Sequence, residues 1–185
     1  MKAAEYTVYQ TPPRTAMEVF NLLPEGTLCE VVENQLYMSP APNRLHQEIS
    51  MLIATAIYNY IMRNGAGKVY SAPIDVFIEP DRNALQPDIV FVSNANASIL
   101  SERGIDGVPD LVVEILSKGN AEHDTVKKKK VYERCGVKEL WYVDPMKRHV
   151  YGFILDKGKY RSLGKPSKTL FIRTFDLKIK LQEVL

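Results

Sequence analysis

The chain has 185 residues, of which 45% are hydrophobic and 25% are charged, and this is the composition of an ordinary globular protein. We expect a single domain over residues 1–185. The formal net charge of +2 permits a polyanionic partner but is too small to indicate nucleic-acid binding by itself.

Cysteine content and hydropathy exclude other classes of protein. Cys29 and Cys135 are the two cysteines, which are too few for a disulfide framework, and their spacing is not that of a metal site. The start, MKAAEYTVYQTPP, lacks the apolar core of a signal peptide, and no apolar run approaches the roughly 20 residues of a membrane span. We therefore expect reduced thiols in a cytoplasmic protein that has no membrane partner.

A short helix and a hairpin are predicted first along the chain. Thr15 and Glu18 have the spacing of a capping box, which predicts a helix through Leu23. Residues 27–32 and 35–39 then have the pattern of two short strands joined by a tight turn.

The strongest helical pattern comes next, and it stops at Asn64-Gly65. Its apolar stripe consists of Leu45, Ile49, Leu52, Ile53, Ala56, Ile57 and Tyr60. A stripe of this width predicts that the helix packs on a large apolar surface, which we expect to be a sheet.

Four segments with β-branched or aromatic residues and flanking turn signals predict this sheet, at residues 68–78, 88–93, 110–116 and 139–143. The middle two are apolar enough to be covered on both faces. A charged segment from about Ala121 to Cys135, followed by Gly136, predicts a helix between the third and fourth strands. A hairpin of residues 149–155 and 159–163 and one or two strands within 170–181 complete the predicted order.

Two carboxylates interrupt the two most apolar strands, since Asp88 lies in QPDIVFVS and Glu114 lies in PDLVVEILS. Taking an ionised carboxylate out of water costs several kcal/mol unless a cation or hydrogen-bond donors compensate. We therefore expect the two strands to be neighbours, in a register that brings both acids to one cation. The alternatives are a turn role for Asp88 after Pro87 and a buried ion pair between Glu114 and Lys128.

Five segments in this order resemble the Uma-type family of restriction endonucleases, which belongs to the PD-(D/E)XK nuclease superfamily. They are LPEGTLCEVVENQLYMSPAPNRLHQEI, APIDVFI, QPDIVFVS, GVPDLVVEILS and KKKKVYERCGVKELWYVDP, and the resemblance extends from Ala16 to Tyr160. It implies an α/β fold with a mixed α+β sheet, namely a restriction-endonuclease-like αβββαβ core flanked by an N-terminal helix and hairpin and a C-terminal hairpin. The periodicities predict the same order of core elements.

The resemblance also implies a metal-dependent hydrolase. Asp88 matches the first metal-binding acid and Glu114 the second, and superfamily analogy makes the backbone carbonyl of Ile115 a third oxygen ligand. The expected ion is Mg²⁺, with Mn²⁺ as a substitute, because Mg²⁺ prefers oxygen ligands and can activate water for phosphodiester hydrolysis. The chain departs from the superfamily motif at Leu116, where the familiar form has a lysine.

Family pattern and helical geometry both select Lys128 as the replacement for that lysine. At about 100° per residue, Lys128 falls about 13° from the centre of the apolar stripe of its helix, whereas Lys127, Lys129 and Lys130 lie roughly 87° or more from that centre. Asp124 lies on the same face one turn earlier and is expected to hold Lys128 or to interact with the helix N-terminus. Whether Lys128 acts as a base or stabilises charge stays open, and we expect desolvation beside the metal cation to help lower its pKa.

Three further residues match the family pattern and are secondary candidates, as is Asp124. They are Glu30 in the first hairpin, His46 at the start of the long helix and Asp75 in APIDVFI. Each has a structural alternative, because His46 suits a helix cap or core edge, Glu30 suits a cross-strand pair, and Asp75 suits strand-end amides.

The resulting hypothesis is a metal-dependent endonuclease that hydrolyses phosphodiester bonds, with DNA as the expected substrate, using Asp88, Glu114 and Lys128. The alternative is a noncatalytic module that retains the nuclease fold and binds nucleic acid or a protein partner. An RNA substrate would use the same site. A homodimer is one expected assembly, because cutting both strands of a duplex commonly uses two active sites.

Overall fold

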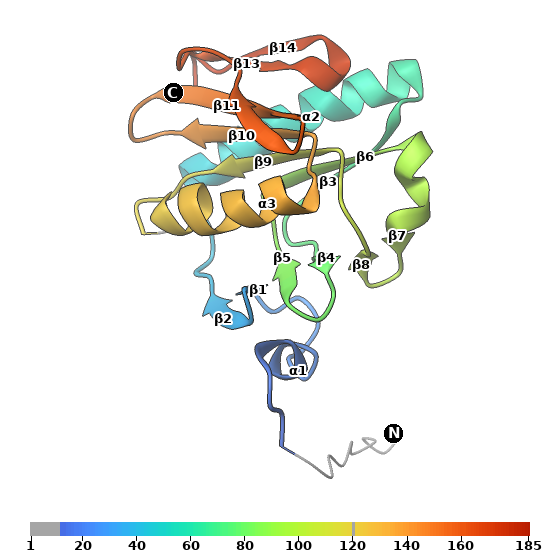
Figure 1. The fold of residues 1–185 in the computed structure, drawn as a ribbon. Helices are drawn as coiled ribbons and strands as arrows, with labels where there is room; N and C mark the ends of the chain where they lie inside the picture. The colour runs from blue at the N-terminus through green and yellow to red at the C-terminus, as the bar shows by residue number, and fades with distance from the viewer. Residues whose placement is uncertain (1–11, 120) are drawn as a thin grey trace, which may run out of the picture.

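A computed structural model describes residues 12–119 and 121–185, so most of the segment in which we expect no signal peptide lies outside the described residues. A six-stranded sheet forms the centre of the molecule (Figure 1). In spatial order its strands are β12 (Lys159–Ser162), β11 (His149–Asp156), β10 (Glu139–Asp144), β9 (Leu111–Ile115), β6 (Ile89–Ser93) and β3 (Gly67–Ser71). β9 and β10 run parallel and the other neighbours antiparallel, which confirms the predicted mixed sheet.

Two helical layers cover opposite faces of this sheet (Figure 1). On one face lies α2 (Arg44–Asn64), which begins at an Asn43 cap and ends at Gly65 in the left-handed conformation, as predicted. On the other face, a π-helical segment η2 (His123–Lys128) continues into α3 (Lys129–Cys135). β6 and β9 are buried between these layers, as predicted, because alternate side chains belong to two different apolar clusters.

The predicted strand 68–78 is wrong as a single element. β3 ends at Ser71, and the chain turns at Ala72-Pro73, where the proline has no N–H for a sheet ladder. β4 (Val76–Glu79) then enters a second sheet. That sheet also contains β2 (Gln35–Met38), β1 (Cys29–Val32), β5 (Asn83–Leu85), β8 (Gly104–Ile105) and β7 (Leu100–Ser101).

The sequence did not predict β5, β7 and β8, because strands of two or three residues are too short to have a readable period. The 3₁₀ segment η1 (Asn94–Ile99) was also missed. When these additions, β4 and the η2 turn are left out, the remaining order is α2, β3, β6, β9, α3 and β10. This is the predicted order of one helix, three strands, one helix and one strand.

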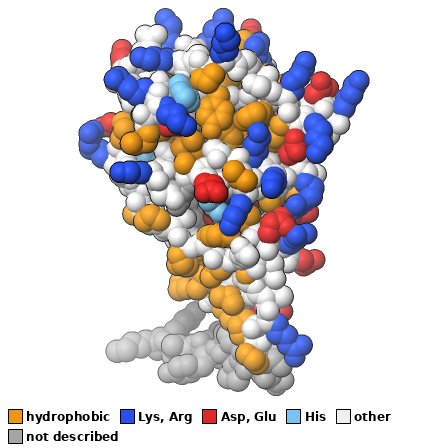
Figure 2. Space-filling view, turned by 60° about the vertical axis from the view of Figure 1, so that its left-hand side comes forward, with side chains coloured by type: hydrophobic (Ala, Val, Ile, Leu, Met, Phe, Trp, Pro, Cys, Tyr) orange, Lys and Arg blue, Asp and Glu red, His pale blue; other side chains and the backbone are white. Residues whose placement is uncertain are grey.

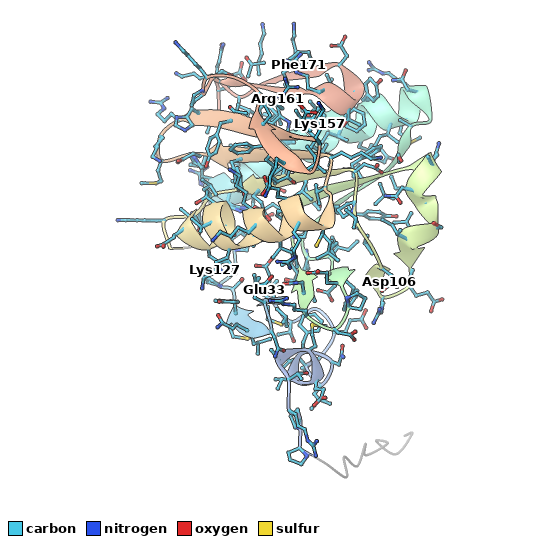
Figure 3. All side chains as sticks on the ribbon, in the orientation of Figure 1. Glu33, Asp106, Lys127, Lys157, Arg161 and Phe171 are labelled. Carbon is cyan, nitrogen blue, oxygen red and sulfur yellow. The ribbon has the colours of Figure 1, made fainter. Side chains whose placement is uncertain are left out.

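The first helix and hairpin form as predicted, with α1 (Ala16–Phe20) shorter than expected. The Thr15 side chain accepts a hydrogen bond from the Glu18 N–H at 3.1 Å. Glu33 and Asn34 have φ of 53° and 57°, which is the left-handed pair that a tight hairpin turn requires. Arg134 of α3 donates to Glu33 at 2.6 Å, so this hairpin is fixed beneath α3, where Figure 3 labels Glu33.

The C-terminal part also agrees with the prediction. β11 and β12 form a hairpin, and β13 (Thr169–Ile172) pairs with β14 (Leu177–Lys180) on the α2 side of the sheet (Figure 1). Buried Glu139 fixes the turn η3 (Arg173–Phe175) between them, because it accepts from the N–H groups of Arg173 at 2.7 Å and Thr174 at 2.8 Å. Both cysteines are free thiols. In the described part of the chain, all helices are too short or too polar to cross a membrane.

Substituting Gly152 should destabilise the central sheet. Gly152 lies opposite Trp141 on the neighbouring strand, and a Cβ at position 152 would lie 2.5 Å from the indole ring. We expect Gly152→Ala to lower the free energy of unfolding by about 1–3 kcal/mol, measured by urea unfolding. Gly119→Ala is the matched control, because a Cβ there meets no atom within 4 Å. Equal unfolding free energies for the two variants would contradict the expectation.

Candidate active site

The two strand carboxylates face each other across neighbouring strands. β6 and β9 are antiparallel, with Ile89 opposite Val113 and Val90 opposite Val112, and one further step places Asp88 opposite Glu114. The Ile115 N–H donates to Asp88 Oδ2 at 2.6 Å, which fixes the aspartate side chain against β9. The expected adjacency and register of these strands are therefore confirmed.

Lys128 projects from the η2–α3 helical layer toward Asp88 and Glu114. Its Nζ lies 2.7 Å from Glu114 Oε1 and 2.8 Å from Glu30 Oε1, and its side chain is 3% exposed. Lys127 and Lys130 are exposed, and Lys129 is half-buried over the ring of Phe153. Helical geometry therefore predicted correctly which of the four lysines points inward.

Glu30 joins Asp88, Glu114 and Lys128 from the second sheet, where it lies opposite Tyr37 in the β1–β2 hairpin. It is buried, and its Oε1 accepts from the Gln86 N–H at 2.7 Å. The Gln86 side chain in turn donates to Thr27 O at 3.1 Å and to Asp75 Oδ1 at 2.8 Å. Gln86, two residues before Asp88, was not recognised from the sequence, because its role depends on two segments that are distant along the chain.

His46 approaches Asp88 from the first turn of α2. Its backbone N–H donates to Asn43 Oδ1 at 3.0 Å, so Asn43 is the cap and His46 is not. The His46 Nε2 lies 3.2 Å from Asp88 Oδ1. Burial lowers the pKa of His46, but the hydrogen bond and charge of Asp88 outweigh this effect and raise it.

Asp124 lies beside Lys128, with 3.5 Å between Asp124 Oδ1 and Lys128 Nζ. Its backbone carbonyl accepts from the Tyr142 hydroxyl at 2.8 Å, and the Tyr132 hydroxyl donates to Glu114 Oε1 at 2.6 Å. Both tyrosines thus hold members of the cluster in place, a role that the sequence did not indicate. The π-helical turn here is of a kind that often accompanies functional sites.

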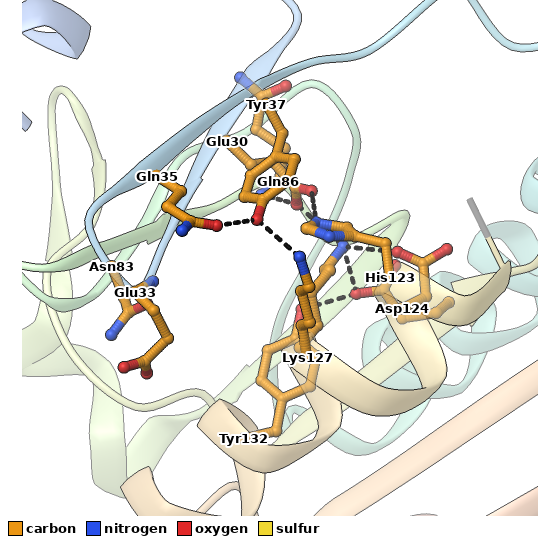
Figure 4. Close-up of polar contacts among 12 residues, drawn as sticks. Glu30, Glu33, Gln35, Tyr37, Asn83, Gln86, His123, Asp124, Lys127 and Tyr132 are labelled. Atoms are coloured by element: carbon orange, nitrogen blue, oxygen red, sulfur yellow. Dashed lines mark hydrogen bonds and ion pairs between the residues drawn. The ribbon is translucent and has the colours of Figure 1, made fainter. Parts of the chain in front are cut away.

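These charged and polar side chains line a cavity of about 340 Å³, which lies between the two sheets and the η2–α3 layer. Residues of the cluster in its wall are Glu30, His46, Asp88, Glu114, Ile115, Asp124 and Lys128. Asp75 is not among them, because Gln86 stands between it and the cavity, and it faces a separate cavity beside Arg103. Figure 4 shows how Glu30, Gln86, Asp124 and Tyr132 converge from different elements.

The buried charges shift one another's pKa values. Desolvation raises the pKa of Glu114 well above its ordinary value, although Lys128 opposes this effect. Burial lowers the pKa of Lys128, but the charges of Glu114 and Glu30 win and raise it well above its usual range. Desolvation therefore acts in the expected direction, but the carboxylates that contact the ammonium group directly outweigh it.

A comparison with family models decides the relationship of this chain to known proteins. Residues 17–181 match the Uma2 model, which is described as "Putative restriction endonuclease". The chain belongs to the Uma2 family. This confirms the family resemblance found in the sequence.

A solved structure supports the fold of this Uma2 protein. It is the crystal structure of "a putative nuclease belonging to DUF820" from Anabaena variabilis ATCC 29413, with a TM-score of 0.74 and 18% sequence identity. The match covers 93% of the present chain and 97% of that chain, so the whole fold corresponds. No curated protein matches the sequence.

The donor atoms of the Uma2 chain fit a hard divalent cation. Both donors that contact the Glu114 carboxylate use Oε1, which leaves Oε2 available at the wall of the cavity. Asp88 Oδ1 has His46 beside it at 3.2 Å, and Ile115 lines the same wall. Carboxylate and carbonyl oxygens are the ligands that Mg²⁺ prefers.

Removing the buried ammonium should destabilise the fold in a pH-dependent way. We expect Lys128→Met to lower the free energy of unfolding by about 3–5 kcal/mol at pH 8, because buried carboxylates lose their counter-ion. The loss should be smaller at pH 5. The pKa values of Glu114 and Asp124 are raised above their ordinary 4.5 and 3.8, so protonation of these acids favours the folded state and the benefit disappears as the pH rises through their folded-state pKa values.

Urea unfolding in the presence of a chelator at both pH values measures this effect. Exposed Lys130→Met is the control and should change the unfolding free energy by less than about 0.5 kcal/mol. A loss for Lys128→Met that is the same at pH 5 and pH 8 would show that the carboxylates do not cause it.

Proposed function

We propose that this protein is a Mg²⁺-dependent endonuclease that hydrolyses phosphodiester bonds in DNA. The observation that supports this most strongly is the placement of Asp88 opposite Glu114 in the wall of one cavity, with Lys128 2.7 Å from Glu114. Membership of a family described as "Putative restriction endonuclease" agrees with the reaction and with DNA as substrate.

Asp88, Glu114 and the Ile115 carbonyl would hold the ion. When bound, Mg²⁺ supplies charge neutralisation at the phosphate and activation of the attacking water. Asp88 is prepared for this role, because the Ile115 N–H holds one oxygen and His46 adjoins the other. His46 would therefore orient Asp88 while leaving the Glu114 side of the cavity open to a phosphate.

Lys128 would act as a fixed positive charge. Its pKa is raised, so it remains an ammonium group and is poorly suited to take a proton from water. Its contact with Glu114 fixes that carboxylate, and its place in the cavity wall puts positive charge where the phosphate gains negative charge in the transition state. Of the two roles left open for Lys128, we therefore propose charge stabilisation and not general base.

The outer surface suits a large charged substrate. On the face of the molecule that Figure 2 shows, lysine and arginine side chains are widely distributed, with acidic groups interspersed. Exposed Lys127 is labelled in Figure 3 on the side of the helical layer that faces the β1–β2 hairpin. Contacts of such lysines with phosphates would add affinity without reading sequence.

Conversion of the strand glutamate to its amide should abolish cleavage. We expect Glu114→Gln, and separately Asp88→Asn, to reduce the rate of plasmid cleavage with Mg²⁺ by at least about 100-fold, because each removes a carboxylate charge from the ion. Glu48→Gln on the exposed side of α2 is the matched control and should cleave at the wild-type rate. Undiminished cleavage by Glu114→Gln would overturn the proposal.

Ion binding can be tested without a substrate. We expect calorimetric titration with Mn²⁺, a tighter-binding substitute for Mg²⁺, to give saturable binding to the wild-type protein and to Glu48→Gln. Glu114→Gln should lose this site, so the number of Mn²⁺ ions bound per protein should fall by one. DNA binding that persists in a chelator and in both acid variants, with no Mn²⁺ site, would favour the noncatalytic nucleic-acid-binding module instead.

A further inference from the structure

A second group of metal-ligating side chains lies behind Lys128, and the proposed reaction does not use it. It consists of Glu30, His123 and Asp124, each of which offers one ligand atom, and these atoms all lie within 4.8 Å of one another. Glu30 comes from β1, and the other two come from the start of η2. The group therefore joins the second sheet to the helical layer.

The imidazole of His123 is the nitrogen ligand of this group, and its surroundings in the fold are unusual. Both ring nitrogens of His123 are buried and have no hydrogen-bond partner among the described residues, although 16% of the side chain is exposed. Its Nε2 lies 3.7 Å from Glu30 Oε2, which is beyond hydrogen-bonding distance. A buried polar atom without a partner is costly, so a ring held in this way indicates that a ligand completes it.

Tyr37 holds the ring in this position. Its aromatic ring lies against that of His123, with 4.2 Å between the centroids. The Tyr37 hydroxyl accepts from Lys127 Nζ at 2.9 Å and donates to Gln35 Oε1 at 2.5 Å, so Tyr37 itself is fixed (Figure 4). This contact restrains the orientation of the imidazole ring.

Charge at the cluster also favours a cation. Three acids, Glu30, Glu114 and Asp124, lie within 3.5 Å of the Lys128 ammonium group, and a fourth, Asp88, lines the same cavity. Lys128 contacts Glu30 through Oε1, while Oε2 of the same carboxylate faces His123. A cation on the His123 side would therefore share Glu30 with Lys128 and would not displace it.

We propose that Glu30, His123 and Asp124 form a second divalent-cation site, for an ion such as Zn²⁺ that accepts imidazole nitrogen as well as carboxylate oxygen. Zinc bonds to these atoms at about 2.0–2.2 Å, so two ligand atoms of one ion lie up to about 4 Å apart. Side-chain rotations that move the ligand atoms by less than about 1 Å would bring all three to one ion. Imidazole makes the site unlike the all-oxygen site proposed at Asp88, which suits Mg²⁺.

An ion reaches this position through a cavity of its own. A space of about 380 Å³ is lined by Tyr37, His123 and Lys127, and Glu30 also lines the cavity that contains Asp88. The second ion would lie in the wall between the two cavities. It would fasten β1 to η2 and so fix the carboxylate that holds Lys128.

Zinc titration in an Asp88→Asn background tests this site separately from the proposed nuclease site. We expect that variant to bind Zn²⁺ saturably and to melt at a higher temperature when Zn²⁺ is added. Adding His123→Ala should weaken Zn²⁺ binding by at least about 10-fold and remove the thermal shift. Adding His149→Ala, which removes a histidine on β11, is the matched control and should change neither result.

Nitrogen NMR of the histidine rings provides a measurement without any change at position 123. The chain has three histidines, so the ring signals can be assigned, and Zn²⁺ should shift those of His123 in the Asp88→Asn protein. Unchanged His123 signals, or equal Zn²⁺ affinity with and without His123, would overturn the proposal. Because the titration contains no nucleic acid, its failure would leave the proposed nuclease activity unaffected, and an inactive nuclease would leave this site untouched.

Discussion

A single buried ammonium group connects the parts of this protein. Lys128 lies between Glu30 of the second sheet and Glu114 of the central sheet, at 2.8 and 2.7 Å, and it is carried by the helical layer. Each carboxylate costs free energy to bury, and the ammonium group compensates for that cost only while all three elements are in place. The cavity between the sheets therefore has walls whose positions depend on one another, which is the preorganisation that a catalytic site needs.

Much of this arrangement could be predicted from the sequence, because side-chain direction is a local property. The helical period alone selected Lys128 among four consecutive lysines, and strand alternation put Asp88 and Glu114 on definite faces. Acids inside apolar strands then indicated a site, since nothing in such a strand explains their burial. The family resemblance and the periodicities agreed on the core, and the family match over residues 17–181 confirms that reading.

The rest depended on contacts between distant segments. Pro73 is a local signal that the strand predicted over 68–78 should end, but no local pattern reveals that Gln86 separates Asp75 from the cavity. The net direction of the Lys128 pKa shift could not be predicted for the same reason. Burial is visible in a sequence pattern, but the number of carboxylates that contact a buried amine is decided by packing.

The two glutamates that contact Lys128 differ in the direction of their pKa shifts, and this difference determines how a bound metal ion would affect each of them. Burial raises the pKa of each, but for Glu30 the charge of Lys128 and the neighbouring donors win and lower the pKa to about 2. Glu114 has a raised pKa and is surrounded by the charges of Asp124, Asp88 and Glu30. A carboxyl group with a raised pKa holds its proton more tightly, and a divalent cation bound there must displace that proton. At the proposed site, ion binding to Glu114 would therefore be coupled to proton release, whereas the lowered pKa of Glu30 would let it serve Lys128 and the proposed second cation together.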